Sequence, residues 1–254
     1  MAEQGPEPEA GVPARQPIFM LPAVVTALAG IMLVIQLASS LILNDDGLQQ
    51  LTLWFGFIPY RLIAPDQVPG GYLPLIWTLF THAFLHAGWE HVLINVAWLL
   101  IFATPVARRY GAMPTLIVFL ISSAVGAVAF AATTLPSVQV LVGASGGIAG
   151  LTGAAMRFIF QPLVVAPHPE TGQPVILGRE IASLKDIWRN PRARNFSLFW
   201  IVLNAAVPIL PAFTGDSVQV AWQAHLGGFI AGLLLMPLFE RRDAPILPQG
   251  DHHA

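Results

Sequence analysis

The chain has 254 residues, of which 55% are hydrophobic and only 10% are charged, whereas an average soluble domain carries about 25% charged residues. Its net charge is -2 and it has no basic tract, which excludes the nucleic-acid-binding class. It has no cysteine, so disulfides, thiolate metal sites and a cysteine nucleophile are excluded as well.

The two ends of the chain are predicted to be short cytoplasmic tails. Residues 1–17 contain three glutamates and several prolines, whereas a cleavable signal peptide begins basic and then turns apolar. We expect residues 1–17 and 241–254 to be disordered, because neither segment has enough apolar residues to form a packed core.

Six apolar blocks between these tails are predicted to be membrane-spanning helices, since a helix needs about 20 apolar residues to cross the hydrocarbon core. The blocks are residues 19–43, 89–107, 113–133, 145–160, 196–213 and 218–239. The fourth block is shorter than the others. The predicted fold class is all-α: a polytopic membrane protein with a six-helix bundle in residues 18–240.

The orientation of the bundle follows from the positions of lysine and arginine. With six alternating spans, the connections after the second, fourth and sixth spans lie on one side, together with Arg15, and hold nearly all of these residues. The other side holds only Arg61. Because cytoplasmic loops are enriched in lysine and arginine, both termini are expected to be cytoplasmic, in an integral multi-pass protein of the plasma membrane.

Two connections are too long to be simple turns. The outer connection, residues 44–88, is rich in tryptophan, phenylalanine and tyrosine, which favours a segment lying in the membrane interface. The inner connection, residues 161–195, is polar and rich in proline, and it is predicted to be a cytoplasmic loop.

A serine between glycines opens the fourth span, in the sequence Gly143-Ala144-Ser145-Gly146-Gly147. Such a serine is sterically open, and the first backbone N–H groups of a helix have no partner within the helix. These donors can hold a developing oxyanion. The alternative is a small-residue packing motif between helices.

A histidine lies within the sixth apolar block. Ser145 needs a base to take its proton, and His225 is suited to that role at neutral pH. Gly228 and Gly232 share its helix face. The fourth span offers small residues at matching spacing, namely Gly146 and Gly150. Packing these faces together would bring Ser145 and His225 within hydrogen-bond reach. The alternative is a structural histidine bonded to a neighbouring carbonyl.

The second span carries His91 and Asn95, which are four residues apart and share a helix face. Both side chains can donate hydrogen bonds to an oxyanion, although ordinary interhelical hydrogen bonding would also explain them. The acid nearest to them, Glu90, lies on another face. We therefore expect a Ser–His dyad rather than a triad with a carboxylate.

His82 and His86 precede the second span and are also four residues apart. With His91 they raise the alternative of a metal site. No nearby aspartate or cysteine completes a ligand set, so a histidine-lined helix entry without a metal or other cofactor is the favoured interpretation.

Taken together, these motifs resemble the rhomboid family of intramembrane serine proteases, over all six spans. The matching residues are Thr81-His82-Ala83, His86, His91 and Asn95, then Gly143-x-Ser145-Gly146, and finally Ala224-His225-x-x-Gly228-x-x-x-Gly232. The order of these motifs along the spans is more specific than any one of them.

The resemblance implies a role for each matching residue. Ser145 would be the nucleophile and His225 the general base and acid, while His91, Asn95 and the Ser145 N–H would form the oxyanion hole. Gly143 and Gly146 would shape the active-site loop; the packing glycines would be Gly150, Gly228 and Gly232. It also implies a bacterial inner membrane, membrane-protein substrates that approach sideways from the lipid bilayer, and a cap formed by residues 211–217.

The chain departs from the family pattern at two positions. Where many rhomboids have Trp-Arg in the outer loop, this chain has Trp77-Thr78, and Ala149 replaces an aromatic residue that stacks on the catalytic imidazole. Trp222 and Phe229 are the candidates to orient that ring instead.

Two other classes of membrane protein are alternatives to a protease. A rhomboid-like pseudoprotease would bind membrane helices without cutting them, but such relatives typically lack the serine or the histidine. A small transporter would need buried carboxylates or cations near the middle of the membrane.

Overall fold

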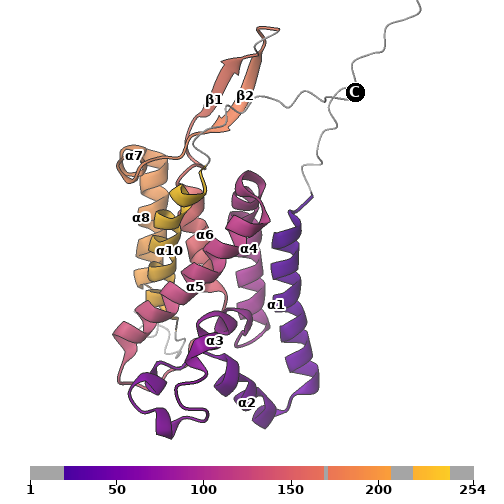
Figure 1. The fold of residues 1–254 in the computed structure, drawn as a ribbon, viewed down its shortest axis with the longest axis vertical. Coiled ribbons are helices and arrows are strands. Elements are labelled where there is room, and N and C mark those ends of the chain that lie inside the picture. The colour runs from indigo at the N-terminus through magenta and orange to yellow at the C-terminus, as the bar shows by residue number, and fades with distance from the viewer. Residues whose placement is uncertain (1–19, 169–170, 207–219, 241–254) are drawn as a thin grey trace, which may run out of the picture.

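Figure 1 shows the computed structural model of the protein, which describes residues 20–168, 171–206 and 220–240. Its main body is a bundle of helices, and both predicted tails lie outside the described residues. The helices of the bundle are α1 (Ala23–Ile42), α4 (Trp89–Tyr110), α5 (Ala112–Thr134), α6 (Ser145–Met156), α8 (Pro191–Ala206) and α10 (Trp222–Leu235), with the short 3-10 segment η5 (Met236–Phe239) after α10.

Four of the described helical segments are long and apolar enough to cross a membrane, namely α1, α4, α5 and α10 with η5. The helix α6 has 12 residues and the described α8 has 16, fewer than the roughly 20 that a crossing needs. The protein is therefore a mostly helical integral membrane protein, and its described residues contain four such helices. The predicted span 196–213 corresponds to α8, which begins earlier, at Pro191, and residues 207–213 of that span lie outside the described residues.

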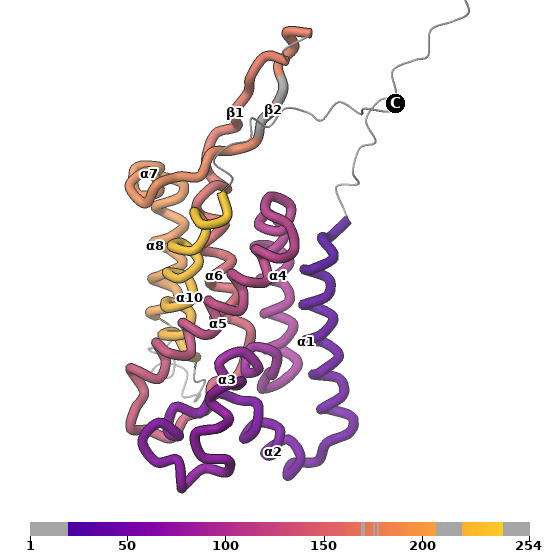
Figure 2. Tube along the Cα trace, in the orientation of Figure 1, coloured from indigo at the N-terminus to yellow at the C-terminus, as the bar shows by residue number. Residues whose placement is uncertain are grey.

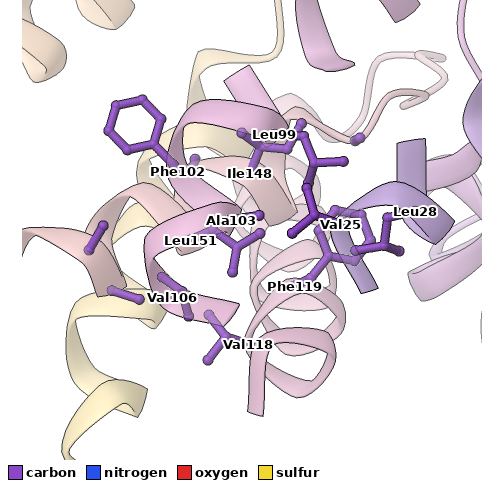
Figure 3. Close-up of a cluster of buried hydrophobic side chains, with 14 of the residues drawn as sticks. Val25, Leu28, Leu99, Phe102, Ala103, Val106, Val118, Phe119, Ile148 and Leu151 are labelled. Atoms are coloured by element: carbon purple, nitrogen blue, oxygen red, sulfur yellow. The ribbon is translucent and has the colours of Figure 1, made fainter. Parts of the chain in front are cut away.

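The helix α6 lies at the centre of the bundle, against α4, α5 and α10. Every residue from Gly146 to Met156 is buried. Glycine, alanine and threonine supply most of these positions, and small side chains let neighbouring helices approach closely. Larger apolar side chains of α1, α4, α5 and α6 pack together beside this helix, as Figure 3 shows for Leu99, Phe119 and Leu151.

The helix α1 packs on α4 through one stripe of its surface. Val25, Leu28, Ala29 and Met32 are buried at the spacing of one helix face, while Val34 on another face is 64% exposed. Because most exposed residues of this helix are also apolar, including Ile31 and Leu37, that face is suited to lipid rather than to water.

The connection at residues 44–88 is folded, and it occupies the end of the bundle opposite the β-strands (Figure 2). It contains α2 (Asp45–Phe55), η1 (Pro59–Leu62), η2 (Pro65–Gln67), α3 (Leu75–Thr81) and η3 (His82–Phe84). Asn44 caps the start of α2 by accepting a hydrogen bond from the Gly47 N–H, as asparagine commonly does at this position.

The buried side chain of Arg61 holds this connection together. It has no exposed surface, and it donates hydrogen bonds to the carbonyl groups of Leu53, Pro69 and Gly71 at 2.5–3.0 Å. These bonds replace the water that a buried guanidinium loses. Trp77 adds a further bond within the connection, because its indole N–H donates to the Trp54 carbonyl at 2.7 Å.

The connection predicted at residues 161–195 contains a β-hairpin, a small exception that the sequence did not predict within a mostly helical fold. The strands β1 (Leu163–Pro167) and β2 (Pro174–Arg179) pair antiparallel and extend away from the bundle (Figure 1). The short helix α7 (Leu184–Arg189) follows. The sequence did not predict this hairpin because two short strands show little periodicity, and prolines such as those at the ends of these strands are typical of loops.

The same end of the bundle carries an ion pair. Arg109 at the end of α4 donates to Glu240 at 2.8 Å, and it also donates to the Arg179 carbonyl of β2. Tyr110 donates to the second oxygen of Glu240 at 2.7 Å. These bonds connect α4, the segment after α10 and the hairpin.

Candidate active site

The start of α6 is held against the outer connection through Gly143. Its N–H donates to the His82 carbonyl at 2.9 Å. Its φ angle of +120° is one that side-chain-bearing residues rarely adopt, and a Cβ here would lie 2.7 Å from Cε1 of His91. Glycine is therefore required at this position, which delivers Ser145 as the first residue of α6.

Ser145 and His225 are brought together as the sequence spacing suggested. The Ser145 hydroxyl and Nε2 of His225 are 2.7 Å apart, which is a short hydrogen bond between side chains 80 positions apart in the chain. The apolar block 218–239 predicts that His225 lies well inside a helix. In the structure α10 begins at Trp222, so His225 lies in its first turn. Both side chains are thus at the starts of their helices.

Glycine contacts set the approach of α6 and α10. A Cβ on Gly228 would overlap the carbonyl of Gly146, and one on Gly232 would overlap the carbonyl of Gly150. Successive contacts advance by four residues along both helices, so the two helices run parallel with a fixed register. Parallel packing places the first turns of α6 and α10 side by side, and these turns carry Ser145 and His225.

A residue that sequence reasoning missed completes the contacts of the imidazole. Oδ1 of Asn204, on α8, lies 2.6 Å from Nδ1 of His225. The Asn204 amide nitrogen donates to the Trp200 carbonyl at 2.8 Å. Phe229, one of the two proposed partners of His225, stacks instead on Trp200, with ring centroids 4.6 Å apart. The available signal was a polar side chain within a predicted span.

His91 lies next to Gly143, and Asn95 lies one turn further along α4. The His91 ring faces the backbone of Gly143, and its Nδ1 accepts from the Ala87 N–H at 3.4 Å, which leaves Nε2 to carry the proton. The Asn95 amide donates to the His91 carbonyl at 2.9 Å. An amide nitrogen has two hydrogens, so one donor of Asn95 remains for a ligand.

Two further histidines support this arrangement. Burial lowers the pKa of His82 to about 4, and its Nδ1 donates to the Thr78 carbonyl at 2.7 Å. Burial and the neighbouring charge of His91 lower the pKa of His86 to about 4. The His86 ring packs edge-on against His91, with centroids 5.1 Å apart. Both rings are therefore neutral at physiological pH.

No metal site is evident in the described segments: between residues 20 and 240, apart from 169–170 and 207–219, no three histidine or acidic side chains are grouped to hold an ion. The predicted cap, residues 211–217, lies outside the described residues.

Comparisons with known proteins agree with the motifs. The Rhomboid domain family matches residues 74–242, which is more than half of the chain. RHOMBOID-like protein 1 from Arabidopsis thaliana is 30% identical over 63% of this chain and 33% of its own length. RHOMBOID-like protein 5 from the same plant is 27% identical over 68% of this chain and 49% of its own length. The chain thus spans a third to a half of these plant relatives.

A bacterial relative is covered more fully. The protein YdcA of Bacillus subtilis (strain 168), whose name places it provisionally among the rhomboid proteases, is 28% identical over 76% of this chain and 87% of its own length. The family match extends from α3 past η5 and so includes every residue of the candidate site. The chain therefore belongs to the rhomboid family.

Proposed function

We propose that the protein is an intramembrane serine endopeptidase that cuts the spanning segments of other membrane proteins, with Ser145 as nucleophile and His225 as general base. The observation that carries this proposal is the 2.7 Å hydrogen bond between the Ser145 hydroxyl and Nε2 of His225. A serine hydroxyl is a weak nucleophile until a base accepts its proton, and this contact has the geometry for that transfer.

The reaction proceeds in two halves. The Ser145 oxygen attacks the scissile carbonyl while its proton passes to Nε2 of His225, which gives a tetrahedral oxyanion. Collapse breaks the C–N bond, and the imidazolium returns the proton to the leaving amine. Water then attacks the acyl-enzyme, with His225 taking its proton and returning it to the Ser145 oxygen as the acid product leaves.

The oxyanion is held by three donors in this proposal: the side chains of His91 and Asn95 and the backbone N–H of Ser145. The first-turn N–H groups of α6 point in the direction of the helix start. Contact between the His91 ring and the Gly143 backbone supports the grouping, because it brings an N–H donor next to the turn that precedes the nucleophile.

The substrate class follows from where the site lies. The 12 residues of α6 rise about 18 Å, which is less than the roughly 30 Å of a hydrocarbon core. With six spans and both termini in the cytoplasm, Ser145 lies beneath the outer surface of the plasma membrane. It can therefore meet a peptide bond of a spanning helix that has unwound locally.

The test is cleavage of a reporter with a spanning segment by the full chain in proteoliposomes. Ser145→Ala and His225→Ala should each lower the rate by on the order of 10⁴-fold or more, as removal of a catalytic serine or histidine does in serine proteases. Ser40→Ala is the matched control, because Ser40 lies on α1 and bonds only within that helix.

A fluorophosphonate probe separates the protease from a pseudoprotease that binds helices. Labelling of the wild type at Ser145, lost in His225→Ala, is the expected result, since the probe reacts with activated serines. Undiminished cleavage by Ser145→Ala would exclude the proposed mechanism, and a folded wild type that neither cuts nor labels would favour the pseudoprotease.

A further inference from the structure

The side-chain amide of Asn204 is oriented by two hydrogen bonds. Its nitrogen donates to the Trp200 carbonyl one turn earlier on α8, at 2.8 Å, and its oxygen lies 2.6 Å from Nδ1 of His225. Because a carbonyl can only accept, the amide nitrogen must face Trp200 and the amide oxygen must face the imidazole.

This orientation fixes the tautomer of the imidazole. An amide oxygen is only an acceptor, so Nδ1 of His225 must carry a proton to bond with it. In a neutral imidazole the other nitrogen, Nε2, then has a free lone pair. That lone pair is aimed at the Ser145 hydroxyl, 2.7 Å away, and this is the tautomer that a general base needs.

We propose that Asn204 is a positioning residue that holds His225 in the base-competent tautomer and makes the Ser145–His225 pair depend on the position of α8. The proposal rests on the proposed function, in which His225 is the base. The amide oxygen of Asn204 takes the place that a carboxylate occupies in a Ser–His–Asp triad. In such a triad the third group orients the imidazole and does not take its proton.

The dependence on α8 follows from how that helix is held. Only Ala193 and Trp200 are buried among its 16 residues. Trp200 stacks on Phe229 of α10, and Asn204 lies one turn further along the same face. A shift of α8 by one or two ångströms would lengthen the Asn204–His225 bond beyond hydrogen-bond range, while the glycine contacts of α6 and α10 would stay in place.

An amide that only satisfied its own hydrogen-bonding groups in the bundle would behave differently. Its loss would lower stability and leave the imidazole tautomer unchanged. The two explanations are separated by Asn204→Leu, which keeps a similar volume without an acceptor, and Asn204→Asp, which keeps an acceptor at the same place.

The experiment measures reporter cleavage by both variants across pH, together with nitrogen-15 NMR of labelled histidine in the full chain. Asn204→Leu should lower kcat by on the order of tenfold or more with KM nearly unchanged, because part of the 10²–10⁴-fold contribution of a general base is lost. Its His225 signals should show a mixture of tautomers. Asn204→Asp should recover much of kcat and move the acidic limb of the pH profile upward.

Three outcomes would overturn the proposal. These are wild-type kcat in Asn204→Leu, equal impairment in the Leu and Asp variants, and a His225 spectrum that stays in the Nδ1–H form without the acceptor. Asn204→Asp keeps the test valid if the Leu variant does not fold. Full activity in Ser145→Ala or His225→Ala would instead refute the proposed function. The NMR measurement of the His225 tautomer does not depend on proteolysis, so the two failures can be told apart.

Discussion

The helices α6 and α8 both contribute to the candidate site, but they are held in the bundle in opposite ways. Every residue of α6 after Ser145 is buried, whereas most of α8 is at least partly exposed, including Phe199 and Val202 at 62% each. Ser145, the proposed nucleophile, thus lies on a fully enclosed helix, and Asn204, the residue proposed to orient its base, lies on a peripheral one.

Residue size explains this difference. The small residues of α6 let α10 approach until the backbone of one helix touches the backbone of the other, which leaves little room for movement. The large apolar residues of α8 project outward, where lipid solvates them as well as protein does. In the proposed mechanism, the closely packed helices α6 and α10 hold Ser145 and His225 together, while Asn204 lies on the more loosely packed α8.

The close packing of α6 against α10, which we call the fixed half of the site, is tested most strongly by Gly232→Leu. The added side chain would occupy the position of the Gly150 carbonyl, which is backbone and cannot rotate away. We expect a loss of at least about 3 kcal/mol, the upper end of overpacking in protein cores, seen as a lower melting temperature and little active protein.

Gly30→Leu is the control for that substitution. A Cβ on Gly30, on α1, meets nothing within 4 Å, so the same change should leave stability and cleavage near wild type. Equal tolerance of leucine at both positions would mean that the glycine contacts do not fix α6 against α10.

The looser packing of α8 against α10 is tested by Trp200→Ala. Removing the ring frees α8 from Phe229, so we expect kcat to fall by up to about tenfold through loss of the Asn204 contact. Combined with Asn204→Leu, the effect should be less than the product of the two single effects, because neighbours that act through one contact are not additive. Phe199→Ala, on the exposed face, should change little.

If the effects of Trp200→Ala and Asn204→Leu on kcat simply multiply, α8 does not act on His225 through Asn204. Cleavage rates and melting temperatures of the wild type, the two single variants and the double variant measure this directly.

Much of the helical framework could be predicted from the chain alone. The apolar blocks at residues 113–133 and 145–160 correspond to α5 and α6, because helix length and hydropathy are local properties. The pairing of Ser145 with His225 was predictable too, since glycines at matching spacing give a close-packed register. The hairpin of β1 and β2 was not, because its pairing is between segments with little periodicity.

Two side chains show where local reasoning stops. Asn204 is visible as a polar residue in an apolar block, but periodicity does not tell which neighbour its face meets. Arg61 counted only as a charge on the outer side, yet its bonds to Leu53 and Pro69 depend on the path of the whole connection. Both contacts are tertiary.

The smallest effect expected of a single side chain concerns pH and the segment that holds the start of α6. The pKa values of His82 and His86 are near 4 in the folded protein and about 6.5 in an unfolded chain. Between these values the unfolded state binds more protons, so stability rises with pH. It is full above about 6.5 and is lost as pH falls towards 4.

Lowering the pH from 7.5 to 5.5 should therefore reduce the free energy of unfolding by about 1 kcal/mol for each of the two histidines. His86→Gln should remove its share of this dependence. Melting curves of the wild type and this variant across the range give the measurement. An identical pH slope in His86→Gln would show that the start of α6 is not held by neutral imidazoles, and the fixed half of the site would then rest on the glycine contacts alone.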